Sequence, residues 1–527
     1  KSLLHFHQTI PVDMLPNVRR EDWYQTATNT NWDFSYVEEE EVFPPELTGK
    51  DAYNVPEEGW ERWEETYKQT AREYYETQHE KDGSVYSVSS AMEQSGLPHS
   101  LGMGWEDVLK FHFASVPLLE RAAVTSESQY ARFAPDSAWR HMAQFGAMDE
   151  LRHTELQLRI PHSFVAEDSQ YDWSKKMFHT EDWVSVAARH LFDDFKAANT
   201  IDSALQITFA FETGFTNMQF LALASDAADV GDIEFAEAIS SIQTDEARHA
   251  QQGNAIIEIL DEYDDLDRAQ YLVDKSFWRC YKLFSALTGP SMDYYTPVED
   301  REMSWGEFME EWIVDQFLEN IESTGLEKPW YWDQFIELVR EGGTSHYMAG
   351  GHYHWRPTLP IAPPGVTKED REWLEEKYPG WEDRWGEKWD RHAEAMRNDN
   401  LEKTVADDLI VLCDLCQLPA IHADPDREKN RLHSHDHDGE TYYFCSEPCQ
   451  WIFENEPERY AEHKSILRRF LAGDIQPQTL EGALEHMGMG EENVHERGID
   501  FRAPEWGDDW ADWKPPSAEP TSAASDD

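Results

Sequence analysis

The chain has 527 residues, of which 40% are hydrophobic and 13% aromatic, so it can form one large core with appended modules and is not a disordered polymer. Its 45 Lys and Arg against 105 Asp and Glu give a net charge of −60, which would repel nucleic acid and anionic membranes. A charge this large destabilises a compact chain unless salt screens it, which indicates a halophile's cytoplasm.

No stretch of 18 or more apolar residues occurs, and residues 1–15 are too mixed for a signal peptide, so we expect a cytoplasmic protein without a membrane span. In chain order, helical spacing of apolar residues is predicted over 60–94 and 105–287. Asp-Val-Gly-Asp at 229–232 is predicted to separate two long helices within the second stretch. The two helices are expected over 209–223 and 235–260. Further helical segments are expected over 305–319 and 330–340, followed by a Pro/Gly-rich break at 357–365.

Composition changes divide the chain further. Short Cys-bearing turns surround a strand-like Thr-Tyr-Tyr-Phe at 441–444, and the end of the chain is rich in Pro, Ser, Ala and Asp. The predicted parts are an N-terminal arm (1–60), a helical domain (61–404), a four-cysteine module (405–470), a C-terminal helical segment (471–510) and a disordered tail (511–527).

Asp-Glu-x-Arg-His occurs twice, at 149–153 and 245–249. On an α-helix, Glu and His three residues apart lie on one face, about 4.5 Å apart along the axis, so both can reach one metal ion or adjacent ions. Glu120 and Glu212 stand in apolar helical surroundings where a lone carboxylate is costly to bury, and they would complete a four-helix di-metal site. The predicted ligands are Glu120, Glu150, His153, Glu212, Glu246 and His249.

Glu-x-x-His alone is a weak signal, because it recurs at Glu76/His79 and Glu492/His495, which we interpret as exposed helix faces or loops. The structural alternative for the duplicated motif is a surface network of Asp, Glu, Arg and His. Carboxylates and imidazole with open positions favour iron, with manganese as an alternative. We expect Asp149 and Asp245 each to accept a hydrogen bond from the ring nitrogen that does not bind metal, on the histidine of the other motif copy. Arg152 and Arg248 are expected to form ion pairs with these aspartates.

Several longer segments share order and spacing with a known family. They are Phe-Glu-Thr-Gly-Phe-Thr-Asn-Met-Gln-Phe at 211–220, Ser-Ser-Ile-Gln-Thr-Asp-Glu-Ala-Arg-His-Ala-Gln-Gln at 240–252, Thr-Gly-Pro-Ser-Met-Asp-Tyr-Tyr-Thr-Pro at 288–297 and Leu-Ala-Gly-Asp-Ile-Gln-Pro at 471–477. With the two motif copies, they resemble the toluene monooxygenase hydroxylase α subunit, a bacterial multicomponent di-iron monooxygenase, from roughly residue 20 to 490.

The resemblance implies a mainly α fold, a ferritin-like four-helix di-iron bundle extended by further helices. To this the cysteine spacing described below adds a small C-terminal zinc-binding α+β module. The resemblance implies one iron held by Glu120, Glu150 and His153 and a second held by Glu212, Glu246 and His249. The centre would activate O2 and insert one oxygen atom into a small arene or alkene, such as toluene, benzene, phenol or propene. The residues that match catalytic positions of the family are Thr216, Asn217 and Gln243, although Thr216 read alone is a helix hydroxyl bonded to a backbone carbonyl.

The substrate pocket expected from the resemblance is one apolar face beside the metals, lined by Val116, Ala123, Phe211 and Phe220. Most Phe and Ala on such helices are simply core. Three residues depart from the family pattern: Pro117, which is expected to interrupt and kink the helix before Glu120, and Leu119 and Arg121, which stand in place of Gly and Tyr. These departures leave pocket size and substrate open.

Four cysteines have metal-ligand spacing, Cys413-x-x-Cys416 and Cys445-x-x-x-Cys449, and are predicted to hold one structural zinc ion. The module resembles that of phenol hydroxylase large subunits. His433, His435 and His437 are alternative ligands, although their Asp-rich segment is predicted to be a solvated loop.

The resemblance also implies partners: β and γ subunits in an (αβγ)2 assembly, an effector protein, a Rieske ferredoxin and an NADH reductase that supplies electrons. No Rossmann glycine pattern opens a strand-to-helix turn here, which fits a chain that receives its electrons from another protein. The alternatives are a ferritin-like di-iron desaturase or oxidase, which the helical mass after Pro297 disfavours, and a non-catalytic iron-binding scaffold subunit, which the complete ligand set disfavours.

Overall fold

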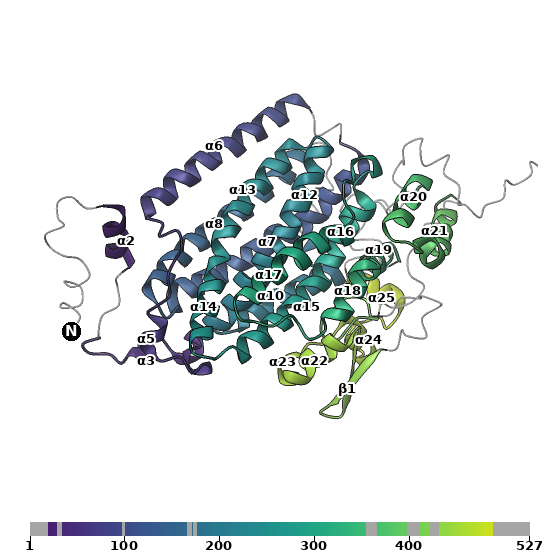
Figure 1. Ribbon diagram of the computed structural model, residues 1–527. Helices are drawn as coiled ribbons and strands as arrows, with labels where there is room; N and C mark the ends of the chain where they lie inside the picture. The colour runs from purple at the N-terminus through teal and green to yellow at the C-terminus, as the bar shows by residue number, and fades with distance from the viewer. Residues whose placement is uncertain are drawn as a thin grey trace, which may run out of the picture.

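A computed structural model of the chain describes residues 19–28, 34–96, 101–165, 171, 177–354, 366–397, 411–420 and 432–487. Within this part the protein is mainly helical, with one two-stranded sheet, and a dense group of long helices forms its centre (Figure 1). The mainly α fold predicted from the sequence is confirmed. Among the described residues, no helix combines the length and apolar character that crossing a membrane requires.

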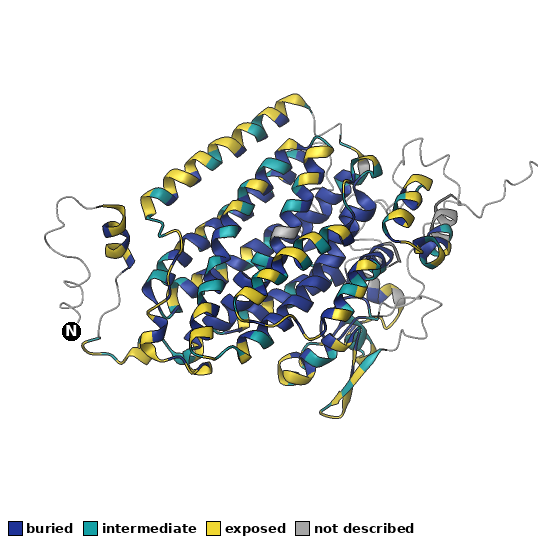
Figure 2. Cartoon of the chain, viewed as in Figure 1, coloured by how far each residue is buried: buried dark blue, intermediate teal, exposed yellow. Residues whose placement is uncertain are grey.

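The first part of the chain wraps the edge of the molecule before the long helices begin. Its elements are α2 (Arg20–Thr28), α3 (Glu39–Val42), α4 (Pro45–Thr48), the 3-10 turn η2 (Lys50–Ala52), α5 (Glu57–Trp60) and α6 (Ala71–Ser95). Thr70 and Glu73 form a capping box at the start of α6, which fixes where that helix begins. Helix α6 lies across α8 and α13 and exposes much of its surface (Figures 1 and 2).

Four long segments form the bundle that carries the duplicated motif. They are α7 (Met103–Phe133), α8 (Ser137–Phe164), the π-helix η4 (Leu205–Thr216) continued by α12 (Asn217–Asp229), and α13 (Ile233–His249). Helix α8 packs on α7 and α13, and η4 and α12 both pack on α13. Much of the surface of these helices is buried (Figure 2), as expected where every helix has neighbours on several sides.

The bundle departs from the predicted helices in three places. Helix α7 continues through Pro117 to Phe133, so the proline does not end it. The helix expected over 209–223 is in fact a π-helix followed by an α-helix, and the one expected over 235–260 is divided at Ala250. The expected break at 229–232 is confirmed, because Gly231 has a left-handed φ of 85° between α12 and α13.

Further helices enclose the bundle. They are α10 (Trp183–Ala197), α11 (Thr200–Ala204), α14 (Gln251–Glu262), α15 (Asp267–Pro290), the π-turn η5 (Ser291–Tyr295), the 3-10 turn η6 (Val298–Asp300), α16 (Trp305–Met309), the π-helix η7 (Glu310–Phe317), α17 (Leu318–Ser323), α18 (Trp332–Arg340), α19 (Gly343–His354), α20 (Lys368–Lys377) and α21 (Trp381–Arg397). Helix α15 is buried along most of its length and packs on η4 and α10. A smaller aromatic core joins α19, α20 and α21 through Tyr378, Trp381, Trp385 and Trp389.

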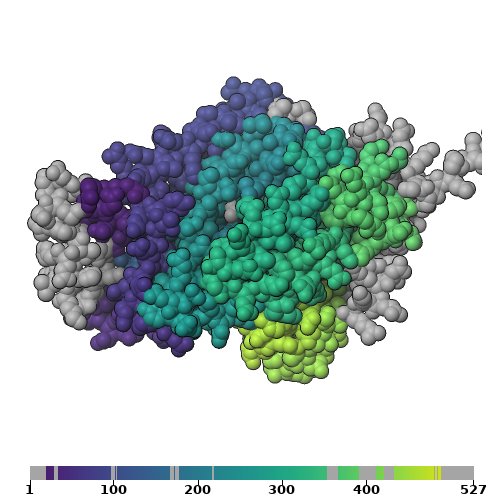
Figure 3. All heavy atoms as spheres, in the orientation of Figure 1, coloured from purple at the N-terminus to yellow at the C-terminus, as the bar shows by residue number. Residues whose placement is uncertain are grey.

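The C-terminal part is a compact α+β module at one side of the helical body (Figure 3). It contains β1 (His433–His437) paired antiparallel with β2 (Glu440–Phe444), then α22 (Glu447–Asn455), α23 (Pro457–Tyr460), α24 (Ile466–Ala472) and α25 (Leu480–His486). Its apolar residues belong to the same hydrophobic core as the bundle. The prediction of a loop around His433, His435 and His437 is wrong, because these residues form strand β1. This strand pairs antiparallel with β2, with Asp436 opposite Thr441.

Candidate metal centre and apolar cavity

The six predicted ligands meet at the centre of the bundle. They form two overlapping groups whose ligand atoms lie within 4.8 Å of one another in each group. One group is Glu120, Glu150, His153 and Glu246, and the other is Glu150, Glu212, Glu246 and His249. All six residues are buried, and α7, α8, η4 and α13 each supply at least one.

Glu150 and Glu246 belong to both groups and lie between the two imidazoles. Nδ1 of His153 is 3.0 Å from Glu246 Oε1 and 3.9 Å from Glu150 Oε2. Nδ1 of His249 is 3.0 Å from Glu150 Oε1 and 3.9 Å from Glu246 Oε2. This near-twofold arrangement follows from the repeated Glu-x-x-His spacing on two facing helices, and it lets both carboxylates reach two ions at once.

The opposite nitrogen of each imidazole points to an aspartate of the other motif. Nε2 of His153 is 3.3 Å from Asp245 Oδ2, and Nε2 of His249 is 3.1 Å from Asp149 Oδ2. An aspartate that accepts the Nε2 proton leaves the Nδ1 lone pair directed into the site. Both histidines are therefore held in the tautomer that a metal ion requires.

Arg152 and Arg248 pair with these aspartates. Arg152 Nη1 is 3.0 Å from Asp245 Oδ2 and its Nε is 2.7 Å from Asp82 Oδ1, while Arg248 forms an ion pair with Asp149. Burial alone would raise the pKa of Asp245, but its bond to the histidine and the nearby cations hold that pKa well below its usual range. Asp245 can therefore remain an ionised acceptor inside the protein.

Helix α6 adds further hydrogen bonds around the ligands, and these contacts were not predicted from the sequence. The Gln78 side-chain amide donates to Asp149 Oδ1 at 2.6 Å and Asp245 Oδ1 at 2.8 Å, which joins the two motif copies. Tyr74 donates to Asp149 at 2.9 Å and Lys81 to Asp245 at 2.6 Å. The spacing of these three residues on one helical face was the available signal, but it is common on ordinary amphipathic helices. Glu76 and His79, on the same helix, are exposed as expected.

The buried atoms at the centre fit a pair of divalent cations. Within the described chain, hydrogen bonds are absent at Nδ1 of both histidines, both oxygens of Glu150 and one oxygen each of Glu212 and Glu246. Burial and then the charge of Glu246 raise the pKa of Glu150 and of Glu212 well above the usual range. Two divalent ions would neutralise the four buried carboxylates and use every unsatisfied atom, and the oxygen-rich donor set suits iron or manganese rather than copper.

The π-helix η4 supplies Glu212 and also Thr216, one further turn along. The Thr216 hydroxyl donates a hydrogen bond to the backbone carbonyl of Phe211 at 3.3 Å. This is the bond expected if Thr216 is an ordinary helix residue. Thr216 also lines the cavity beside the metal centre. The Asn217 side chain lies outside the described residues. Gln243 is half-buried on α13, one turn before Glu246.

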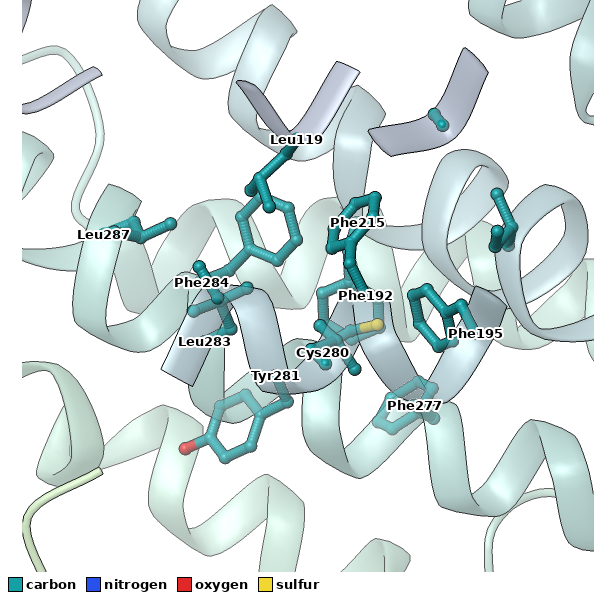
Figure 4. Packing of buried hydrophobic residues seen from close by; sticks show 14 of the residues in the cluster. Leu119, Phe192, Phe195, Phe215, Phe277, Cys280, Tyr281, Leu283, Phe284 and Leu287 are labelled. Atoms are coloured by element: carbon teal, nitrogen blue, oxygen red, sulfur yellow. The ribbon is translucent and has the colours of Figure 1, made fainter. Parts of the chain in front are cut away.

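A cavity of about 20 Å³ adjoins Glu120, Glu150, Glu212 and Glu246, which is room for roughly one water molecule. Its wall includes all four predicted pocket residues, Val116, Ala123, Phe211 and Phe220. The other lining side chains, not predicted as pocket residues, are Leu119, Phe192, Thr216, Gln219, Leu283, Phe284 and Leu287. Figure 4 shows Leu119 beside Phe284 and Leu287, so α7 and α15 narrow the cavity together. Arg121 is exposed and lies away from it.

The four cysteines form a second cluster. Cys416 Sγ is 3.8 Å from Cys445 Sγ, which is 3.7 Å from Cys449 Sγ, and Cys413 completes a group within 4.8 Å. These distances exclude a disulfide, whose sulfurs lie about 2.05 Å apart. A tetrahedral ion with metal–sulfur bonds of about 2.3 Å separates its sulfurs by about 3.8 Å. The indole N–H of Trp278 donates to Cys449 Sγ at 3.3 Å, so α15 also contacts this cluster.

Four helices that bring six carboxylate and imidazole side chains to a common centre define a ferritin-like bundle with a two-metal carboxylate site. Residues 32–263 match the Methane/Phenol/Alkene Hydroxylase family, and residues 427–464 match the YHS domain. The chain is 41% identical over 497 residues to the alkene monooxygenase system oxygenase component subunit alpha of Xanthobacter autotrophicus (strain ATCC BAA-1158 / Py2), covering 94% of this chain and 98% of that protein.

Two other relatives agree. The phenol 2-monooxygenase oxygenase component of Pseudomonas sp. (strain CF600) is 29% identical, over 89% of this chain and 90% of that protein. The crystal structure of xenon-pressurised phenol hydroxylase from Pseudomonas sp. OX1 superposes with a TM-score of 0.78 at 26% identity, covering 90% of this chain and 95% of that one. The chain therefore belongs to the methane/phenol/alkene hydroxylase family, as an oxygenase α subunit, and the family resemblance inferred from the sequence is confirmed.

Proposed function

We propose that this subunit holds two iron ions and oxygenates small hydrocarbons, with short alkenes as the first class to test. The observation that carries the proposal is the set of buried, unsatisfied donor atoms on Glu150, Glu212, Glu246 and the two histidines, on a chain of this family. Glu120, Glu150 and His153 would hold one ion, Glu212, Glu246 and His249 the other, and Glu150 and Glu246 would reach both. Bound iron would supply the two-electron activation of O2.

The protein's own contribution is to keep the surroundings of the ions dry and apolar. A hydrocarbon offers no hydrogen-bonding group, so it must be held by shape against side chains such as Phe211, Phe284 and Leu119. Short alkenes are the first class to test because the most extensively matched relative reported above is named for alkene oxidation. Thr216 is the hydroxyl on this wall, and we assign it the handling of a proton beside the metals, with Asn217 and Gln243 as further candidates.

The proposed electron source is NADH, through a reductase and a Rieske ferredoxin, and the proposed assembly is (αβγ)2 with an effector protein. The relative's description as one component of a monooxygenase system supports a multicomponent enzyme. We place the complex in the cytoplasm of a salt-adapted cell on the strength of its net charge of −60.

We also assign one structural zinc ion to the four cysteines. The sulfur separations of 3.7 and 3.8 Å match a tetrahedral zinc site, and the indole N–H of Trp278 is suited to a thiolate acceptor. Asp414 ties the first cysteine turn to its surroundings, because it binds Arg468 through both oxygens at 2.6 and 2.8 Å. Because Trp278 belongs to α15, the zinc site would hold the module against the helical body rather than take part in the reaction.

Turnover by the purified complex tests the function. The iron-loaded αβγ complex, with its reductase, ferredoxin and effector, is given NADH, O2 and a panel from propene to toluene and phenol. Epoxide or phenolic product that carries one atom from ¹⁸O2 supports the proposal. Styrene formed from ethylbenzene, which is included in the panel because it has two adjacent saturated carbons, would favour the desaturase alternative. Iron-loaded complex without any product would favour a scaffold subunit.

Iron content tests the ligand set separately. The Glu246→Ala variant should lose most of its iron, because Glu246 faces both histidines. Glu76→Ala is the matched control, since Glu76 has the same Glu-x-x-His spacing on the exposed side of α6 and should leave iron content unchanged. Two irons per chain in Glu246→Ala would remove this residue from the site.

A further inference from the structure

A chain of buried polar side chains connects the wall of the cavity to one metal ligand. The side-chain nitrogen of Gln219 is 3.1 Å from Nδ1 of His112, and Nε2 of His112 is 2.7 Å from Oε1 of Gln157. The side-chain nitrogen of Gln157 then donates to Oε1 of Glu120 at 2.8 Å. The exposed fractions along the chain are 5%, 3%, 0% and 7%, so bulk water does not compete for these bonds.

The direction of every bond follows from Glu120. An ionised carboxylate only accepts, so Gln157 must present its NH2 group to Glu120 and its oxygen to His112. That oxygen requires a donor, which places the His112 proton on Nε2. Nδ1 is then an acceptor, and Gln219 must present its NH2 group. A single arrangement of two amides and one neutral imidazole therefore satisfies the whole chain.

The imidazole of His112 is fixed in this role by its surroundings. Phe113 and Phe235 contact it edge to face, with ring centroids 5.4 and 4.9 Å away. Burial lowers the pKa of His112 to about 4, so the ring is neutral at neutral pH, as the bond pattern requires. Gln219 lines the cavity, three residues after Thr216 on the same wall.

We propose that Gln157 is a positioning residue for Glu120, and that His112 and Gln219 hold Gln157 in the orientation that this role needs. The amide of Gln157 binds Oε1 of Glu120, which leaves Oε2, 3.7 Å from Nδ1 of His153, to face the ion on that side. Rotation of the carboxylate would deprive the buried Gln157 amide of its acceptor. These hydrogen bonds would therefore make Glu120 a ligand through one oxygen. They also connect the orientation of its carboxylate to Gln219 on the cavity wall.

This inference rests on the proposed di-iron function, and a spectroscopic test separates the two. Gln157→Leu removes the amide at similar volume, and Mössbauer spectra of the ⁵⁷Fe-loaded complex report each iron site. We expect the doublet of one iron, the one on the His153 side, to change while the other stays as in the wild type. The rate of iron release to a chelator from the changed site should rise roughly 10- to 100-fold. Gln129→Leu is the control, because it removes a half-buried glutamine amide on α7 that donates to Ala198 and Thr200 rather than to a metal ligand.

A second pair of variants keeps the test independent of how well Gln157→Leu folds. His112→Phe removes the donor to Gln157 and should give the same one-sided change, while His112→Gln retains an N–H donor and should restore the wild-type spectrum. Wild-type spectra and iron release in both Gln157→Leu and His112→Phe would overturn the inference and leave the di-iron proposal standing. Wild-type complex that binds no iron would overturn both proposals at once.

Discussion

Glu127 is a buried acid that forms no ion pair among the described residues, and its replacement by glutamine should stabilise the protein. It lies two turns after Glu120 on α7 and is 1% exposed. The indole N–H of Trp139 donates to Gln252 Oε1 at 2.7 Å, so Gln252 presents its NH2 group to Glu127 Oε1, also at 2.7 Å. Within the described chain, Oε2 makes no hydrogen bond, and it lies close against Gly146 of α8.

The expected magnitude follows from the pKa of Glu127. Burial is the main reason that it rises from 4.5 to about 8. Below pH 4.5 the carboxyl is protonated in both the folded and the unfolded chain, so it has no effect. Between pH 4.5 and 8 the unfolded chain loses this proton and the folded chain keeps it, so stability falls by about 1.4 kcal/mol per pH unit, or roughly 5 kcal/mol in all.

Glutamine carries no such proton, so the advantage of Glu127→Gln over the wild type should grow from pH 4.5 to 8 and then level off. With about 2.1 cal/mol/K of unfolding entropy per residue, 5 kcal/mol corresponds to roughly 4 °C in Tm for a chain of 527 residues. Differential scanning calorimetry of both proteins across this pH range, at constant high salt, measures the difference.

Asp194→Asn is the contrasting control for this assay. Asp194 is also buried, but Lys275 is 3.2 Å and Arg279 2.6 Å from its Oδ2, and these cations hold its pKa well below the usual range. Its replacement should lower Tm throughout the same pH range, because it leaves buried cations unpaired. Parallel Tm profiles for wild type and Glu127→Gln would refute the reasoning, since they would mean that Glu127 ionises in the folded protein without cost.

Three other predictions concern the cavity, the cysteines and salt. Leu119→Ala should enlarge the cavity, cost about 2–5 kcal/mol of stability, and raise kcat/KM for toluene relative to propene; an unchanged ratio would remove Leu119 from substrate selection. Cys449→Ser should reduce zinc measured by mass spectrometry from one ion per chain to near zero, and full retention of zinc would contradict the four-thiolate site. Dialysis from about 3 M to 0.1 M KCl should lower Tm by at least several degrees because it removes screening of the net charge of −60, and a constant Tm would contradict salt adaptation.

The convergence of the six side chains could be predicted because it follows from the spacing of residues along each helix. Glu and His three residues apart on a helix define one face, and a second copy of the motif implies a facing helix. Glu120 and Glu212 could be found because isolated carboxylates among apolar residues need a partner. The break between α12 and α13 was visible for a similar reason, since Gly231 and its acidic neighbours end a helical pattern.

Other features depend on tertiary contacts that leave little trace in the sequence. In the sequence, Gln78 and Lys81 look like ordinary surface residues. Their hydrogen bonds to Asp245 arise only because α6 packs against the bundle. The π-helix has the same apolar pattern as an α-helix, so its extra residue per turn could not be predicted. The strand at His433–His437 was missed because its alternating His, Ser and Asp residues lack the apolar period of a buried strand, while its partner strand supplies the pairing.

The buried carboxylates of this acidic protein lie in three kinds of environment, which differ in how the negative charge is compensated. Asp194 and Asp245 are ionised because arginine and lysine lie beside them. Glu127 forms no ion pair within the described chain, and burial raises its pKa to about 8 although the charge of Arg248 acts in the opposite direction. At the bundle centre, burial and neighbouring carboxylates raise the pKa of Glu150 and Glu212 well above the usual range, and oxygens of Glu150, Glu212 and Glu246 lack hydrogen bonds within the described chain. Two metal ions are the remaining way to satisfy them, which is why we expect metal loading and folding of the bundle to be coupled.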